Sequence, residues 1–248
     1  MKPISVVIPT LQKNLELLLN LINVLEKDSN VDEIIIIDNS LKGLNYTSNK
    51  LKIINPSTNL YVNPSWNLGV KSSVNENVAI LNDDITIPEN FCSNVFERFT
   101  DDMGIVGYNI DFVKETQEIL PSPPKQEMNL IEIANRCSGW GVAIFFKKTN
   151  YIEIPDDLKI FYGDDWLIYQ NKKRKKKIYS INGQKIYHYG SLSSASGSLN
   201  PIAKNDDALY KKLTRDRWEK IFSFNRLYKG FTLTVLGLKF SFHYDKRH

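Results

Sequence analysis

The hydrophobic positions of the first hundred residues fall into short, continuous runs. Residues 4–8 (ISVVI) and 34–37 (IIII) are almost entirely β-branched, and KLKIIN and VAILNDD continue the series at 50–55 and 78–84. Apolar runs of this length without polar alternation are typical of strands buried on both faces of a parallel sheet. We therefore expect four buried strands in the N-terminal part of the chain.

Helical segments alternate with these runs. Residues 14–26 carry leucine and isoleucine at the spacing of one helical face. Further helices are predicted after Pro64 in NPSWNLGVKSS and over NFCSNVFERF at 90–99. This strand-helix alternation predicts an α/β fold with a doubly wound, parallel sheet, in which ligands bind at the carboxyl ends of strands near the point where strand order reverses.

The second half of the chain has a different pattern. MGIVGYNIDF and GVAIFFKK predict strands, whereas PSPPKQEMN predicts a surface loop. A helix is expected to start near Asp164 and Asp165, and its basic end leads into a further strand. A Gly/Ser-rich loop follows His188, and from about residue 205 the chain reads first helical and then aromatic. The sequence thus predicts one principal domain with a C-terminal extension.

Composition excludes several classes of protein. The loop after the first strand, PTLQKN, has no glycine, which argues against a Rossmann dehydrogenase or a P-loop NTPase. Three histidines and two cysteines leave little room for a zinc site or a disulfide framework, so we interpret Cys92 and Cys137 as buried apolar residues. The first apolar run is too short for a signal peptide, and no run reaches the roughly 18 apolar residues that span a membrane. A cytoplasmic protein is expected.

The positive charge of the chain is local. The net charge is +4, and KKRKKK at 172–177 supplies six positive charges, so the remainder sums to 4 − 6 = −2. No general nucleic-acid-binding surface is indicated. A solvated helix end explains the lysine run best; attraction to an anionic membrane, joined by the aromatic and basic tail through an amphipathic face, is the second interpretation.

Acidic side chains stand at the ends of two predicted strands. Asn82, Asp83 and Asp84 follow one strand directly, and Asp38 follows another. Two carboxylates at a ligand-binding edge suit Mg²⁺ together with substrate phosphates, although Asn and Asp are also favoured in ordinary turns and caps. Asp38 is either a cap or an acceptor for the N–H of a nucleotide base.

Three other positions carry candidate chemistry. Asp164 and Asp165 lie between Gly163 and Trp166, where partial burial would raise a carboxyl pKa and favour a general base; a helix cap is the plain alternative. His188 is either a structural histidine or a metal ligand beside a mobile loop.

A series of segments resembles the family 2 glycosyltransferases in order and approximate spacing. The segments are SVVIPT, IIIIDNS, NLYVNPSWNLGV, AILNDDITIP, CSGWGVAIFF, FYGDDWLIYQ and IYHYGSLSS. The resemblance covers roughly residues 3–220, and it looks like the bacterial rhamnosyl- and galactosyltransferases of cell-surface polysaccharide assembly. It implies an inverting, nucleotide-sugar-dependent enzyme with the GT-A fold, a mixed and mostly parallel sheet flanked by helices.

The resemblance also implies roles for residues on the donor side. Pro9 and Thr10 would line the nucleotide pocket, and Asp38 would hold the base. Asn67 and Gly69 match the Asn-x-Gly motif beside the diphosphate. The implied donor is a nucleoside-diphosphate sugar.

Metal binding and catalysis are implied for a second set. Asn82-Asp83-Asp84 match the DxD-type motif. Because Asn82 replaces the first aspartate of that motif, Asp84 would be its main ligand for Mn²⁺ or Mg²⁺. His188 matches a histidine that contacts the metal or the diphosphate. Asp165 would be the catalytic base.

Acceptor-side residues complete the implied site. Asp164 replaces the usual glutamate before the base, and Gly139, Trp140 and Trp166 would lie beside the acceptor. Trp140 is either an aromatic floor for a sugar ring or a core residue.

The resemblance further implies a domain plan and partners. A GT-A domain would occupy 1–204, with a nucleotide-sugar half at about 1–110 and an acceptor half at about 111–204, and an extension would occupy 205–248. The acceptor would be a glycan or lipid-linked hydroxyl in capsule, O-antigen or lipooligosaccharide synthesis, at the inner face of the membrane. A nucleotidyltransferase and a non-catalytic sugar- or nucleotide-binding protein are the alternatives, and the oligomeric state is left open.

Overall fold

A mixed sheet of eight strands organises the first part of the chain. The computed structural model describes residues 2–108, 119–136, 139–189, 200–214, 222–227, 230–236 and 238–243. The sheet order is β3-β2-β1-β4-β8-β6-β9-β7. Its strands are β1 (Ile4–Thr10), β2 (Val31–Asp38), β3 (Leu51–Ile54), β4 (Asn77–Leu81), β6 (Met103–Tyr108), β7 (Asn129–Glu132), β8 (Ala143–Lys147) and β9 (Lys177–Asn182). Only β7 and β8 run against the others, so the expected mixed, mostly parallel sheet is confirmed.

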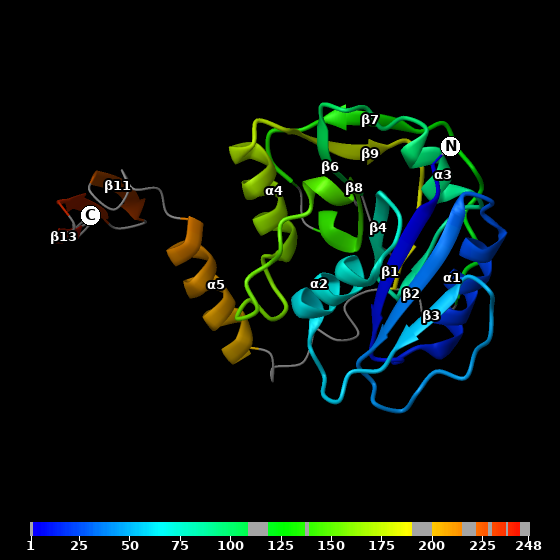
Figure 1. Cartoon of the computed structure of the whole chain (residues 1–248). Helices are drawn as coiled ribbons and strands as arrows, with labels where there is room; N and C mark the ends of the chain where they lie inside the picture. The colour runs from blue at the N-terminus through cyan, green and yellow to red at the C-terminus, as the bar shows by residue number, and fades with distance from the viewer. Residues whose placement is uncertain are drawn as a thin grey trace. The chain divides into compact units, whose positions relative to one another are not determined.

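Helices cover both faces of this sheet (Figure 1). They are α1 (Leu15–Lys27), α2 (Val62–Ser72), α3 (Phe91–Phe96) and α4 (Gly163–Lys173). The buried faces of α1 and α3 share one apolar core with Ile4, Val6 and Ile8 of β1. On the opposite face, α2 packs against the same strand. Its Gly69 lies so close to β1 that a Cβ there would be 2.1 Å from Val7 Cγ1. The alternation of β1 residues between two helical layers explains why the strand is apolar throughout.

The strand order reverses between β1 and β4. The chain passes from β1 to β2 and β3 on one side, then returns through α2 to β4 on the other side. Thr10 and Leu81 end these two neighbouring strands. The gap that opens at such a switch point is where open α/β sheets bind ligands.

A short antiparallel ribbon extends this edge. β5 (Ile85–Thr86) pairs with β10 (Tyr187–His188), with His188 opposite Ile85. Two 3₁₀ turns, η1 (Trp140–Val142) and η2 (Lys148–Asn150), flank β8. The ribbon therefore brings a segment about a hundred residues downstream against the NDD sequence.

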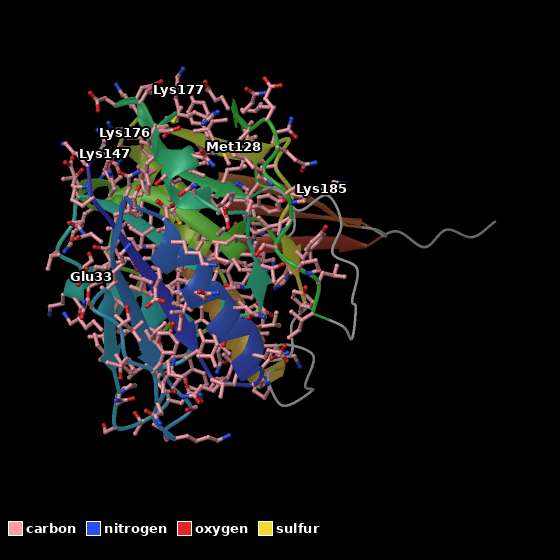
Figure 2. All side chains as sticks on the ribbon, turned by 90° about the vertical axis from the view of Figure 1, so that its right-hand side faces the viewer. Glu33, Met128, Lys147, Lys176, Lys177 and Lys185 are labelled. Carbon is pink, nitrogen blue, oxygen red and sulfur yellow. The ribbon has the colours of Figure 1, made fainter. Side chains whose placement is uncertain are left out.

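The lysine run at 172–177 lies at the opposite end of the sheet, where the parallel strands β6 and β9 begin. Helix α4 ends at Lys173, and Figure 2 shows Lys147, Lys176 and Lys177 close together at one end of the first unit. Most of the run contacts groups of its own chain: Lys172 the Ala134 carbonyl, Lys173 the Tyr169 ring, Arg174 the Thr149 carbonyl, Lys176 the Asp101 carbonyl and Lys177 the carboxylates of Asp102 and Glu132. These contacts support the helix-end interpretation.

The chain divides into two compact units, Met1–Asp206 and Asp207–His248. Helix α5 (Asn200–Thr214) begins in the first unit, and the second contains β11 (Phe222–Leu227), β12 (Gly230–Val235) and β13 (Leu238–His243) in one antiparallel sheet. The helical start of the extension is confirmed. Its aromatic part, which was expected to present an amphipathic face, forms strands in which apolar and polar residues alternate with period two.

The expectations for the two cysteines and for the Gly/Ser-rich loop have different outcomes. Cys92 is buried as a free thiol, as expected, whereas Cys137 and the Gly/Ser-rich loop lie outside the described residues. In the portion of the chain that the structure describes, no helix is long and apolar enough to cross a membrane.

Candidate active site at the sheet switch point

Thr10 and Asp83 meet across the switch point. The Thr10 hydroxyl donates to Asp83 Oδ2 over 2.5 Å, and the same hydroxyl accepts the Gln12 N–H over 2.8 Å. Burial raises the pKa of Asp83 to about 6; the Thr10 hydrogen bond opposes this shift, and the charge of Asp84 adds to it. A carboxyl group at a strand end is thus held in a setting that disfavours its ionised form.

Asp84 and His188 form the second contact at this edge. His188 Nε2 lies 3.2 Å from Asp84 Oδ1, and the Tyr189 N–H donates to the Asp84 carbonyl over 2.9 Å. The His188 contact does not have the geometry of a hydrogen bond, so Asp84 Oδ1 is buried and accepts none. A buried carboxylate oxygen without a donor costs free energy unless a cation or another donor reaches it. The structure therefore brings together both residues expected to bind the metal.

Asp38 is held by its neighbours at the end of β2. It is fully buried; Oδ2 accepts the Gln12 side-chain N–H over 2.9 Å, and Oδ1 accepts the Ser40 N–H over 2.9 Å. The Gln12 amide also donates to the Gly43 carbonyl over 3.1 Å. Pro9 lies on the adjoining strand, paired with Ile37. Both carboxylate oxygens of Asp38 thus already accept hydrogen bonds from the protein, and its contact with a nucleotide base stays a prediction.

The Asn67 side chain is engaged with a neighbouring loop. Its Nδ2 donates to the Ile154 carbonyl over 2.7 Å, and its Oδ1 accepts from the Tyr151 hydroxyl and the Ile154 N–H over 2.8 and 3.0 Å. Gly69, two residues on, allows α2 to approach Val7. Both residues position α2 in the structure, and their contact with a donor stays a prediction.

The turn η1 carries the acceptor-side residues toward the NDD sequence. The Asn82 N–H donates to the Val142 carbonyl over 3.0 Å. Gly139 has a left-handed φ of 73°, a conformation that favours glycine, and a Cβ at Gly141 would lie 3.0 Å from Asp164 Oδ2. Glycine at these two positions lets the turn form and lets Asp164 lie directly against it.

Arg136 binds both acidic residues at the start of α4. Its Nε and Nη2 donate to the two carboxylate oxygens of Asp165 over 2.7 and 2.6 Å, and its Nε lies 3.2 Å from Asp164 Oδ2. Burial raises the pKa of Asp164; the Arg136 charge opposes this effect, and Asp165 adds to it. The two-point contact fixes the orientation of the Asp165 carboxylate.

The two tryptophans have different positions. Trp140 is fully buried, its ring packs against Gly107, and its Nε1 donates to Ser180 Oγ over 2.8 Å. The core interpretation of Trp140 is therefore correct, and the sugar-floor interpretation is wrong, because no part of the ring is exposed. Trp166 is half-buried, and its Nε1 donates to the Glu153 carbonyl over 3.0 Å. A contact between Trp166 and an acceptor stays a prediction.

The edge includes residues that the sequence did not single out. Arg136 and Gln12 contact predicted site residues, and three non-glycine residues have left-handed φ angles there: Gln12 (51°), Tyr61 (66°) and Tyr162 (64°). Such backbone strain is concentrated at functional sites. Gln12 lies two residues after Thr10 of the PT pair, which was the available signal; Arg136 had none. In the described residues no group of three or more His, Cys, Asp or Glu side chains forms a metal cage.

Comparison with known proteins agrees with this geometry. The model of glycosyl transferase family 2 matches residues 5–171, about two thirds of the chain. That range includes Thr10, Asp38, Asp84 and Asp165, whereas His188 follows it. No curated protein sequence matches the chain.

Solved structures show the same fold. A crystal structure of GalNAc-T7 with UDP, GalNAc and Mn²⁺ superposes with a TM-score of 0.62 at 13% identity, covering 88% of this chain and 49% of that one. S. aureus TarS 1–349 matches with a TM-score of 0.54 at 14% identity, covering 98% of this chain and 99% of that one. TarS 1–349 in complex with UDP-GlcNAc gives 0.57 at 17% identity over 88% and 68%. The chain thus spans about half the length of GalNAc-T7, and the shared architecture is the GT-A fold.

Proposed function

The chain belongs to glycosyl transferase family 2, and we propose that it transfers a sugar, with inversion, from a nucleoside diphosphate to a hydroxyl group of a bacterial surface glycan. The enzyme is a glycosyltransferase on the strength of its family and fold. The observation that carries the proposal is the Asp84–His188 pair at the switch point, where Asp84 Oδ1 is buried without a hydrogen-bond donor.

The proposed donor side is the edge formed by β1, β2 and β4. Thr10, Asp38 and Asp83 converge there, within the half of the domain at about 1–110. The UDP and UDP-GlcNAc in the crystal structures of GalNAc-T7 and TarS support a uridine nucleotide as the first donor to test.

The residues at this edge fit a divalent cation. Mg²⁺ and Mn²⁺ take carboxylate oxygen ligands, Mn²⁺ also accepts imidazole, and such sites commonly complete their coordination with substrate phosphates and water. Asp84 and His188 would hold the ion, and the mixed donor set favours Mn²⁺. When bound, the cation neutralises negative charge on the leaving diphosphate.

The acceptor side is assigned to Asp164 and Asp165, in the half at about 111–204. Asp165 remains the proposed base, oriented by Arg136, and removes the proton of the acceptor hydroxyl as that oxygen attacks the sugar. Asp164 lies beside it, and its raised pKa makes it the competing candidate. Asp165→Asn and Asp164→Asn distinguish them: the base is the residue whose variant binds donor normally but loses turnover.

The acceptor proposed is a glycan or lipid-linked intermediate of capsule, O-antigen or lipooligosaccharide synthesis, used at the cytoplasmic face of the membrane. The resemblance to bacterial surface-polysaccharide transferases supports it. Membership of family 2 disfavours a nucleotidyltransferase. A non-catalytic binding protein of the same fold is separated from the proposal by measured turnover.

Thermal unfolding tests the donor site first. The protein is heated with UDP-, GDP-, dTDP- and CMP-sugars, each with and without Mn²⁺. At a ligand concentration of about 100 times Kd, binding stabilises the native state by about 2.7 kcal/mol, which corresponds to roughly 5–10 °C in a chain of this size. We expect a metal-dependent shift with one nucleotide class.

A matched pair of variants identifies the metal ligand. Asp84→Ala should lose the metal-dependent shift, whereas Asp32→Ala, which removes an exposed carboxylate from β2, should keep it. A full shift in Asp84→Ala would refute the metal assignment. No shift of the unmodified protein with any donor would refute the proposed donor site.

A further inference from the structure

The antiparallel sheet of the second unit, here called the tail sheet (β11, β12 and β13), has two chemically different faces. Residues that pair across neighbouring antiparallel strands share a face, and successive residues alternate between faces. The printed register pairs Phe224 with Leu233 and Leu233 with Phe240, and it holds along all six residues of each strand. The register therefore assigns every position of the tail sheet to one face or the other.

One face is almost entirely apolar. Its positions hold Phe222, Phe224 and Arg226 from β11, Phe231, Leu233 and Val235 from β12, and Leu238, Phe240 and Phe242 from β13. The opposite positions hold Ser223, Asn225, Leu227, Gly230, Thr232, Thr234, Lys239, Ser241 and His243. We define the first set as the apolar face, and a sheet with such a face requires a partner that removes it from water.

The large apolar side chains that are exposed on β13 belong to this face. Leu238 is 65% exposed and Phe240 is 46% exposed, and Leu236, in the turn before the strand, is 80% exposed. Leucine and phenylalanine at such exposure on one strand are typical of a binding surface rather than of scattered surface residues.

The charge of the second unit indicates the kind of partner. Residues 207–248 contain ten lysines and arginines and four acidic residues, a net charge of 10 − 4 = +6, whereas residues 1–206 sum to 4 − 6 = −2. Apolar and aromatic residues combined with a local positive charge match the interface of a bilayer that contains anionic lipids. We propose that the apolar face of the tail sheet docks the protein onto an anionic membrane surface.

A second copy of the chain fits this face less well. Three strands of six residues cover about 20 Å by 14 Å, or about 300 Å², at ordinary strand rise and spacing. Stable dimers bury about 800 Å² on each partner. A face-to-face dimer would also bring two units of charge +6 together. A bilayer has no such area requirement and carries the opposite charge.

This location differs from the lysine run at 172–177. Four of its six residues, Lys172, Arg174, Lys176 and Lys177, contact carbonyl or carboxylate groups of the first unit. The inference therefore moves the membrane contact to the tail sheet. It does not depend on the proposed transfer reaction, since binding is measured without a nucleotide sugar.

Vesicle flotation of the full chain tests the proposal. The unmodified protein is mixed with vesicles of phosphatidylglycerol and phosphatidylcholine, or of phosphatidylcholine alone. We expect at least tenfold stronger partition to the anionic vesicles, because each basic residue near such a surface contributes roughly fivefold. Raising salt from about 0.1 M to about 1 M, which shortens the screening length from ~10 Å to ~3 Å, should weaken partition strongly.

A double variant locates the surface. Leu238→Ser with Phe240→Ser should reduce partition by at least tenfold, since both side chains lose their apolar transfer energy. The control is Leu15→Ser with Val74→Ser, which removes two exposed apolar residues from the first unit and should change nothing. Circular dichroism establishes that each variant is folded.

Three results would overturn the inference. The first is equal partition of the unmodified protein to anionic and neutral vesicles, or none. The second is a concentration-dependent dimer that Leu238→Ser/Phe240→Ser abolishes, which would assign the apolar face to a second copy. The third is a monomer that ignores vesicles but loses thermal stability in the double variant, which would assign the face to the chain's own first unit.

Discussion

Asp206 is expected to be the most important single carboxylate for the stability of the first unit. It is fully buried near the middle of α5, and it accepts three consecutive backbone N–H groups, from Lys159, Ile160 and Phe161, over 3.1, 2.9 and 2.9 Å. These residues immediately precede α4, which carries the proposed base. Asp206 thus connects α5 to the segment that leads into Asp164 and Asp165, the candidate catalytic residues.

The cost of removing this carboxylate follows from its partners. Hydrogen bonds to a charged group contribute about 1.5–3 kcal/mol each, and a buried N–H left without an acceptor costs about 1–3 kcal/mol. Three such groups set an upper range near 9 kcal/mol, but the N–H groups are only part-buried, so water can replace some of the loss. We expect Asp206→Ala to lower the free energy of unfolding by about 3–5 kcal/mol, a shift in Tm of roughly 10 °C.

Urea unfolding measures this loss, and Asp207→Ala is the matched control. Asp207 is the next residue of the same helix and pairs with Lys211 over 2.7 Å, a contact worth about 0.5 kcal/mol. Asp206→Asn keeps one side-chain oxygen and should fall between the two. Turnover of the folded Asp206→Ala protein should also decrease, since the loop before α4 loses its support. Equal midpoints for Asp206→Ala and Asp207→Ala would refute the reasoning.

Two further changes have defined outcomes. The pKa of Asp83 is raised to about 6, so the folded protein binds more protons than the unfolded chain and loses stability as pH rises from about 4 to above 6. Asp83→Asn should remove this loss and be more stable at pH 7 by up to about 3 kcal/mol, as measured by urea midpoints at pH 4.5 and 7. Gly107→Ala should destabilise the protein by about 3 kcal/mol, because the new Cβ would lie 2.2 Å from the Trp140 ring, and near-UV circular dichroism should report the displaced indole. An unchanged pH profile, or an unchanged spectrum and midpoint, would contradict the respective prediction.

Much of the fold followed from local pattern. The runs at 4–8, 34–37 and 78–81 are apolar without alternation, and each became a strand buried by helices on both faces. Because the carboxyl ends of parallel strands share one edge, the positions of Asp38 and Asp83 at strand ends were enough to predict that they would lie at one ligand edge. The physical reason is that a strand buried on both faces excludes polar side chains along its length, so that they occur at its ends, where they can reach water or a ligand.

The contacts that complete the site could not be predicted in the same way. Arg136 reaches Asp165 across 29 residues, and Gln12 reaches Asp38 across 26, and neither pairing leaves a periodic signal in the sequence. The antiparallel position of β8 between β4 and β6 likewise depends on pairing between distant segments, which no local pattern of the sequence indicates. The tail sheet differs, because FTLTV and KFSFH alternate with period two, and that signal was present but interpreted as an amphipathic extension.

The two halves of the candidate site differ in the groups that contact their carboxylates. On the proposed acceptor side, the single guanidinium of Arg136 contacts both Asp164 and Asp165 and holds them in place. On the proposed donor side, Asp83 contacts a hydroxyl and Asp84 an imidazole, and burial, together with the charge of Asp84, raises the pKa of Asp83. Such an edge gains stability when a cation binds, because the cation removes both the repulsion and the unsatisfied oxygen of Asp84. Protonation of Asp83 also relieves this repulsion, so protons would compete with the proposed metal, and binding of the proposed donor should weaken below about pH 6. In the proposed roles, the fixed guanidinium thus serves the acidic residues assigned to the acceptor side, and an exchangeable cation would serve those assigned to the donor side.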